Sequence, residues 1–294
     1  MTQFHLMELH RCTRLRSNAQ CRPKALTPKG RQNMLLNHLR GIGISVCAVA
    51  AAMSSAHADE VKVLTTGILK GSFPQIAAQF EKSTGHKVTM SWGPSSGNSP
   101  EAAQVRVKNG EQIDVLIMVD QGMDELIAGG YLKPVERKDI AVSRIGVAVK
   151  AGHSLPDISN AQALKKALLD AKSVGYSEGA SGSYVANVLL KKLGIEEQVK
   201  PKAKVILGRK FVGESLVEGE VELGLQQISE LRLEKGITIV GPLPEDLQKA
   251  SVVSAAVSPK ATSISAARQF YDFLSTPFAT TAIKNSGVDL PAAK

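Results

Sequence analysis

The residues best suited to chemistry form one short run, Ser177-Glu178-Gly179-Ala180-Ser181-Gly182-Ser183-Tyr184. An apolar strand over 173–176 precedes this run, and a helix to about Leu193 follows it. A Gly/Ser turn between a strand and a helix presents free backbone N–H groups and the positive end of the helix dipole, which together bind anions. The alternative is an ordinary turn with a serine N-cap, which is a common arrangement.

Other predicted strand ends carry residues of the same kind. They are Thr65-Thr66-Gly67, Ser95 and Ser96 within the turn 93–99, Asp120-Gln121, Gly208-Arg209-Lys210 and Gln226-Gln227-Ile228-Ser229. In open α/β sheets ligands bind beyond the carboxyl ends of the strands, so we expect these segments to surround one site. Hydroxyls, amides and backbone N–H groups, with Arg209 as a guanidinium fork, suit a small anion.

Three side chains near these turns are candidates for proton transfer, namely Lys70, Glu178 and Tyr184. Lys70 would act as a base if it were desolvated, although most loop lysines are solvated. Asp120 and Glu178 are candidates for a carboxylate pair. Each also follows a strand directly, so a structural capping role is the alternative.

Apolar strand-like runs alternate with segments of helical period along the chain, which predicts an α/β fold with mostly parallel sheets. Strands over 143–150 and 251–257 are placed to cross between two groups of elements. We therefore expect two lobes with a cleft between them. The first lobe is predicted to comprise 59–141 and 258–294, and the second 142–257.

The basic character of the chain belongs to its N-terminal part. Eight of the 36 Lys and Arg residues precede Asp59, and the remaining 236 residues hold 28 basic and 26 acidic residues. A nucleic-acid partner requires a basic face on the folded domain, so none is predicted.

The same N-terminal part predicts export. The apolar run 42–53 and the small-x-small sequence Ala56-His57-Ala58 indicate a signal peptide over 34–58, with the mature chain starting at Asp59 in the periplasm. The run is too short to span a bilayer stably, so no membrane insertion is expected after cleavage. A retained anchor is the alternative. Residues 1–33 resemble no signal element, and we interpret them as a disordered leader or a start assigned upstream of Met34.

Several classes of chemistry are excluded by composition. Cys12, Cys21 and Cys47 all lie before Asp59, in the leader or the signal peptide, so the mature chain has no disulfide, thiolate nucleophile or cysteine-bound metal. Only His86 and His153 remain as histidines, and no metal or cofactor is predicted. Phosphate-loop, dinucleotide-binding, hydrolase and zinc-protease motifs do not occur in the required contexts.

From Val61 to about Leu290 the chain resembles the periplasmic molybdate-binding proteins, which have a two-lobed type II solute-binding fold. The resemblance rests on Phe80–Val88, the Ser95-Ser96-Gly97 turn, Ile113–Ile117, Glu178–Tyr184 and Val217–Gly224. It implies a monomer that binds a small carboxylate or oxyanion and, in a transport role, an ABC permease as partner.

Two positions depart from the molybdate pattern, since Ile68 and Gln227 stand where that family has hydroxyl side chains. These departures, with Gly179–Tyr184 and Leu225–Glu230, resemble the branch of the fold that contains aconitate isomerase. That resemblance implies an allylic proton shift between trans- and cis-aconitate. The alternative is a receptor without activity that delivers molybdate-like oxyanions or organic anions to an ABC importer.

Overall fold

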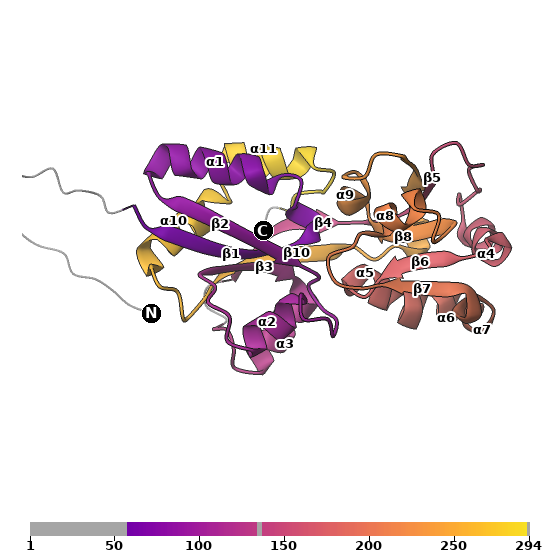
Figure 1. Ribbon diagram of the computed structural model, residues 1–294, viewed down its shortest axis with the longest axis horizontal. Helices are drawn as coiled ribbons and strands as arrows, with labels where there is room; N and C mark the ends of the chain where they lie inside the picture. The colour runs from indigo at the N-terminus through magenta and orange to yellow at the C-terminus, as the bar shows by residue number, and fades with distance from the viewer. Residues whose placement is uncertain (1–57, 134–136, 293–294) are drawn as a thin grey trace, which may run out of the picture. The chain divides into compact units, whose positions relative to one another are not determined.

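The computed structural model of the protein describes residues 58–133 and 137–292. The predicted leader, the predicted signal peptide except Ala58, and all three cysteines lie outside these residues. The described chain folds around two five-stranded sheets flanked by helices (Figure 1), which confirms the predicted α/β fold with two lobes. Across the two described ranges, no helix combines the length and apolar character needed to cross a bilayer.

The first sheet has the strand order β2-β1-β3-β10-β4. Its strands are β1 (Glu60–Thr66), β2 (Lys87–Gly93), β3 (Val115–Val119), β4 (Arg137–Ser143) and β10 (Ser251–Val257). β1 pairs in parallel with β2 and β3, so that Val63 lies opposite both Met90 and Val115. β10 runs antiparallel to both β3 and β4. Only β10 is therefore reversed within this sheet.

The second sheet has the order β7-β6-β8-β5-β9 and repeats this plan. Its strands are β5 (Ile145–Lys150), β6 (Val174–Ser177), β7 (Ala203–Ile206), β8 (Leu223–Gln227) and β9 (Ile237–Pro242). β6 pairs in parallel with β7 and β8, and Tyr176 lies opposite both Val205 and Leu225. β5 is the reversed strand, antiparallel to β8 and β9. The carboxyl ends of β6, β7 and β8 consequently meet at one edge.

Helices cover both faces of the first sheet (Figure 1). The helices α1 (Phe73–Thr84), α10 (Ile264–Phe273) and α11 (Pro277–Asn285) lie on one face, and α2 (Ala103–Lys108) and α3 (Asp120–Ala128) on the other. Phe80 packs edge-on against Phe270, with the ring centroids 5.1 Å apart. These buried aromatic rings fix α1 against α10, and α1 starts from the loop that holds the short helix η1 (Gly67–Leu69).

The second sheet is covered in the same way. One core packs its strands against α4 (Ala161–Asp170), α5 (Ala180–Tyr184), η3 (Val185–Leu189), α6 (Leu190–Lys192) and α7 (Glu196–Val199). Residues of α8 (Val212–Val217) and α9 (Ile228–Leu231) pack on the other face. The short helices η4 (Lys200–Lys202) and η5 (Glu245–Leu247) lie in connections. The helical run from α5 to α6 contains one wider π-helical turn, η3.

Local sequence explains where several helices begin and end. Pro74 lies in the first turn of α1, where its missing N–H costs no hydrogen bond. Gly85 ends α1 in the left-handed conformation at φ 79°, and its N–H donates to Glu81 O at 2.9 Å. The Asn160 side chain caps α4 by accepting the Ala163 N–H at 2.9 Å.

The two connections between the sheets differ from the predicted lobe boundaries. The predicted strand over 143–150 is divided at Arg144 into the end of β4 and β5, and the preceding strand segment of β4 was not expected. β10 belongs to the first sheet rather than to the second lobe. Gln248 joins the two connections, since it accepts the Ile145 N–H and donates to Ile145 O, each at 2.9 Å.

Candidate functional site

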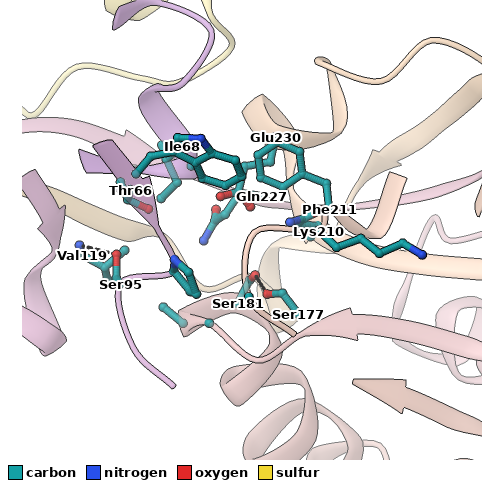
Figure 2. Close-up of a pocket in the computed structure, with 17 residues that line it drawn as sticks. Thr66, Ile68, Ser95, Val119, Ser177, Ser181, Lys210, Phe211, Gln227 and Glu230 are labelled. Carbon is teal, nitrogen blue, oxygen red and sulfur yellow. Dashed lines mark hydrogen bonds between the residues drawn. The ribbon is translucent and has the colours of Figure 1, made fainter. Parts of the chain in front are cut away.

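A small cleft lies between the carboxyl ends of strands from both sheets (Figure 2). The first lobe contributes the ends of β1, β2 and β3, and the second contributes the ends of β6 and β8 with the segment before α8. The lining residues are Thr66, Gly67, Ile68, Trp92, Pro94, Ser95, Val119, Ser177, Gly179, Ala180, Ser181, Gly208, Lys210, Phe211, Gln226, Gln227 and Glu230. Its polar lining consists mainly of hydroxyls, amides and backbone, as expected for the site of a small anion.

Six of the predicted ligand-binding residues line this cleft. They are Thr66, Gly67, Ser95, Ala180, Ser181 and Gln227. Ser95 is held in place because its Oγ accepts the Val119 N–H at 3.0 Å. Gln227 is held by a hydrogen bond from its Nε2 to Ser251 Oγ at 3.1 Å, and the residue is 2% exposed. The buried Gln227 Oε1 accepts no hydrogen bond from the described residues.

The turn after β6 brings the start of α5 to the cleft. Gly179 adopts an extended conformation before α5, and Ser181 Oγ lies 3.4 Å from Ser177 Oγ (Figure 2). Gly182 is required by close packing, because a Cβ at this position would overlap the Ser177 carbonyl. The first N–H groups of α5 lack intrahelical partners, and Ala180 and Ser181 at the start of this helix line the cleft.

Glu178 does not line the cleft and instead joins the two lobes. Its Oε1 accepts the Gly208 N–H at 2.7 Å, and its Oε2 accepts the N–H groups of Asn98 and Ser99 at 3.2 Å each. Burial acts to raise the pKa of Glu178, but the hydrogen bonds from Ser99, Gly208 and Asn98 outweigh it and lower the pKa. The ionised carboxylate of Glu178 thus links the second lobe to the loop after β2 through hydrogen bonds.

The other predicted proton-transfer candidates also lie outside the cleft lining. Tyr184 donates its hydroxyl to Leu247 O at 2.8 Å and packs against the core of the second lobe. Lys70 places its Nζ 4.1 Å from the centroid of the Trp92 ring. Their predicted roles as proton donors or acceptors stay predictions.

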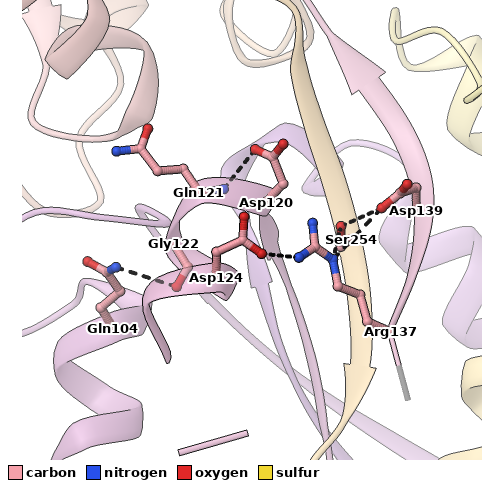
Figure 3. A network of polar contacts seen from close by, with 8 residues as sticks. All are labelled: Gln104, Asp120, Gln121, Gly122, Asp124, Arg137, Asp139 and Ser254. Atoms are coloured by element: carbon pink, nitrogen blue, oxygen red, sulfur yellow. Dashed lines mark hydrogen bonds and ion pairs between the residues drawn. The ribbon is translucent and has the colours of Figure 1, made fainter. Parts of the chain in front are cut away.

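The remaining predicted ligands are likewise apart from the cleft lining. Arg209 donates its Nε to Trp92 O at 2.8 Å, so this part of the fork contacts backbone of the other lobe. Asp120 accepts the N–H of Gln121 at 2.7 Å beside a polar network around Arg137 (Figure 3). In that network Arg137 pairs with Asp124 and donates to Ser254 Oγ at 3.1 Å. Thr65, Ser96, Gly182 and Ser183 complete the predicted residues that do not line the cleft.

Glu230 is a functional candidate that the sequence reasoning did not single out. It lies in α9, one turn beyond β8, and its carboxyl group faces the cleft although the residue is only 8% exposed (Figure 2). Burial raises the pKa of Glu230 to about 8, against smaller lowering effects of the Gln226 side chain and the Lys70 charge. A carboxyl group with this pKa exchanges protons near neutral pH.

Stacked aromatic rings form one wall of the cleft. Trp92 from the end of β2 and Phe211 from the segment before α8 stack with ring centroids 5.0 Å apart. Trp92 therefore has an aromatic partner from the other lobe.

The comparison with known families agrees with this two-lobed geometry. Residues 61–289 match the family described as bacterial extracellular solute-binding protein. The chain belongs to this family. It is 35% identical over 247 residues to an aconitate isomerase from Pseudomonas sp., covering 84% of this chain and 94% of the relative. It is 30% identical over 258 residues to the molybdate-binding protein ModA of Azotobacter vinelandii, covering 85% and 95%.

Solved structures of solute-binding proteins share the fold. The periplasmic molybdate-binding protein of Azotobacter vinelandii superposes with a TM-score of 0.62 at 23% identity, covering 79% of this chain and 99% of that chain. The sulfate-binding protein SubI of Mycobacterium tuberculosis gives a TM-score of 0.63 at 17% identity, covering 80% and 88%. Within the described part of this family member, His, Asp and Glu side chains form no group of three or more arranged to hold a metal ion.

Proposed function

We propose that this protein is a periplasmic isomerase that interconverts trans- and cis-aconitate. The observation that carries the proposal is the buried carboxyl group of Glu230, which shares one cleft with the anion-binding turn Ser177–Ser181. A receptor needs only donors for its ligand, whereas a proton shift also needs a titratable group beside the reacting carbon. The 35% identical aconitate isomerase supports the same conclusion.

The proposed reaction is an allylic proton shift. The Glu230 carboxylate takes a proton from the methylene carbon of trans-aconitate, and the C–H electrons form a new C=C bond as the original double bond shifts its electrons toward a carboxylate. The same carboxyl group then returns the proton to the former vinylic carbon, which gives cis-aconitate and regenerates the carboxylate. Proton number and charge balance, so the chain needs no cofactor for this step.

The other cleft residues suit the carboxylates of the substrate. The first turn of α5 supplies backbone N–H groups, and the hydroxyls of Ser95, Ser181 and Thr66 line the same space. Ile68 lines the cleft with an apolar side chain and is 2% exposed. Ile68 stands where the molybdate-binding proteins have a hydroxyl side chain, so one hydrogen-bond donor for an oxyanion is missing. This favours a carbon acid over molybdate as the ligand.

The second candidate function is that of a receptor without activity for an ABC importer. The 30% identity to ModA and the membership of a solute-binding family favour it. In this role Glu230 would remain protonated and donate a hydrogen bond to the bound anion. The two candidates therefore differ in whether Glu230 transfers its proton.

The test is to mix the purified mature chain with trans-aconitate and to follow the products by NMR in D₂O. The proposal predicts cis-aconitate that carries deuterium at the newly protonated carbon, or protium where the transfer is internal. Thermal shifts should respond to aconitate or citrate, since a ligand at a hundredfold excess over its Kd stabilises by about 2.7 kcal/mol. Binding of molybdate without any conversion of aconitate would establish the receptor function instead.

Export is part of the proposal. A chain cleaved after Ala58 would begin at Asp59, whose carboxylate accepts a hydrogen bond from Ser263 Oγ at 2.7 Å. Mass spectrometry of a periplasmic extract should find Asp59 as the N-terminus. A dominant species that retains Cys47 would contradict cleavage.

A further inference from the structure

Lys70 lies against aromatic rings from both lobes, and these two rings line the cleft. Its Nζ lies 4.1 Å from the centroid of the Trp92 ring and 4.8 Å from that of the Phe211 ring. Trp92 belongs to the first lobe and Phe211 to the second. A cation over aromatic faces is attracted by their negative π-electron density, so the stacked pair fixes the position of the ammonium group.

The loop that carries Lys70 approaches Glu230 closely. A Cβ at Gly67 would overlap Glu230 Oε1 and would lie 2.9 Å from the Phe211 ring. Glycine at this position therefore lets the loop after β1 pack directly on α9. Lys70 follows three residues later, which brings its charge from the first lobe toward a carboxyl group of the second.

Two side chains act on the Glu230 carboxyl group in addition to its burial. Lys70 acts on it from the loop after η1, and the Gln226 side chain contacts it from β8. Glu234, which follows α9, interacts with Glu214 of α8 and with the same Lys70. Among these described neighbours Lys70 is the cation. Lys210 lines the same cleft, and its charge is paired with Glu218 and Glu220.

We infer that Lys70 is a positioning residue for the proposed isomerisation, and that its positive charge, held against the Trp92 and Phe211 rings, stabilises the ionised form of Glu230. This inference rests on the proposed function. Glu230 takes the proton from one carbon and returns it to the other, and Lys70 acts on this step through its charge. The positive charge of Lys70 increases the fraction of Glu230 that is ionised. Lys70 does not itself exchange protons with the substrate.

The arrangement also ties this effect to contact between the lobes. The cation is clamped only when the loop after β1 and Phe211 lie together, because the rings that hold it come from opposite lobes. Trp92→Leu should therefore weaken the effect of Lys70 without removing its charge.

The first test is the pH dependence of kcat/KM for trans-aconitate. In Lys70→Met the rising limb should move upward by at least about half a pH unit, because the carboxylate loses its stabilising cation. Lys70→Arg should keep the limb near its original position. The matched control is Lys138→Met, since Lys138 also lies over an aromatic ring, 4.0 Å from the Tyr271 centroid, in the first lobe. An unmoved limb in Lys70→Met would overturn the inference.

The second test does not depend on activity. Infrared difference spectra of the whole protein should contain a protonated-carboxyl band that disappears in Glu230→Gln. The pH at which this band is lost should rise in Lys70→Met and stay in Lys138→Met. If the band moves but aconitate is never converted, the charge relation holds and the proposed function fails. If the band does not move while the rate falls, Lys70 has another role and the inference is wrong.

Discussion

Glu178 and Glu230 follow neighbouring strands of the second sheet, β6 and β8, and their carboxyl groups have opposite surroundings. Glu178 accepts N–H groups of Gly208, Asn98 and Ser99, which lower its pKa against the effect of burial. Glu230 is buried beside apolar and aromatic groups, and its pKa rises to about 8. The first carboxylate is committed to holding the lobes together, and the second is left able to gain and lose a proton.

The comparison shows that the sheet topology determines where the two carboxyl groups lie. Local hydrogen bonding determines whether each one can act as a proton acceptor. Both residues lie where strand ends of a parallel sheet converge. Backbone N–H groups aimed at Glu178 stabilise its charge, so it is a poor proton acceptor near neutral pH. Glu230 is the better candidate for acid–base chemistry, because its pKa is near the pH at which it would operate.

The largest expected effect concerns the turn that carries Glu178. Gly182→Ala should lower the free energy of unfolding by about 3 kcal/mol or more, because the new Cβ overlaps the Ser177 carbonyl and the backbone must move. Urea unfolding measures this change. The matched control is Gly179→Ala in the same turn, where the nearest atom to the new Cβ is Pro94 Cβ at 3.4 Å. Equal stability of the two variants would show that the turn is not tightly packed.

The next effect separates the two glutamates by the pH dependence of stability. The folded protein keeps the Glu230 proton up to about pH 8, whereas the unfolded chain releases it near 4.5. The free energy of unfolding should therefore fall as the pH rises through this window. Glu230→Gln abolishes this loss and should be more stable than the parent at pH 7 by roughly 3 kcal/mol. Parallel pH profiles for the two proteins would refute the raised pKa.

Glu178 should show the opposite dependence. A lowered pKa stabilises the fold above the ordinary carboxyl pKa, and this contribution is lost as the pH falls through the lowered value. Glu178→Gln should lower the free energy of unfolding by about 2 kcal/mol at pH 7, since an amide cannot accept all three N–H groups with a full charge. The difference should disappear in acid. Glu196→Gln, at the exposed pair with Lys191, is the control and should change stability little.

The smallest effect concerns Arg209. Its Nε donates to Trp92 O, and the residue does not line the cleft. Arg209→Lys should change the Kd for aconitate by less than about threefold, because the substitution alters only the hydrogen bond from Arg209 to the backbone of the first lobe. Isothermal titration measures this change. A loss of tenfold or more would restore the sequence-based prediction that the guanidinium fork grips a substrate carboxylate.

Much of the cleft could be predicted because parallel strands bring their carboxyl ends together. Ser95 and Ser181 each follow a strand closely and Gln227 is the last residue of β8, so the alternation of strands and helices was enough to place them. Glu230 was missed because its burial comes from Gly67, more than a hundred residues earlier in the chain. The usable signal was an acidic residue one helical turn beyond the polar strand end Gln226-Gln227.

Long-range contacts also explain the less accurate predictions. Nothing near Glu178 in the sequence reveals that Asn98 and Ser99 supply its hydrogen bonds. The strand β4 begins with the charged residues Arg137-Lys138-Asp139. Because of these charges the sequence did not predict a strand here, although β4 lies at the edge of the first sheet. Charged residues are common at exposed sheet edges, where they oppose aggregation.

The most direct test of the central claim is to compare the parent protein with Glu230→Gln in binding and in turnover of trans-aconitate at pH 7.5. Glutamine resembles the protonated carboxyl group in shape and lack of charge, so the Kd should stay within about threefold. Turnover should fall about a thousandfold, because the proton acceptor is gone. Conversion of trans-aconitate by Glu230→Gln at the parental rate would contradict the assignment of Glu230 as the group that moves the proton.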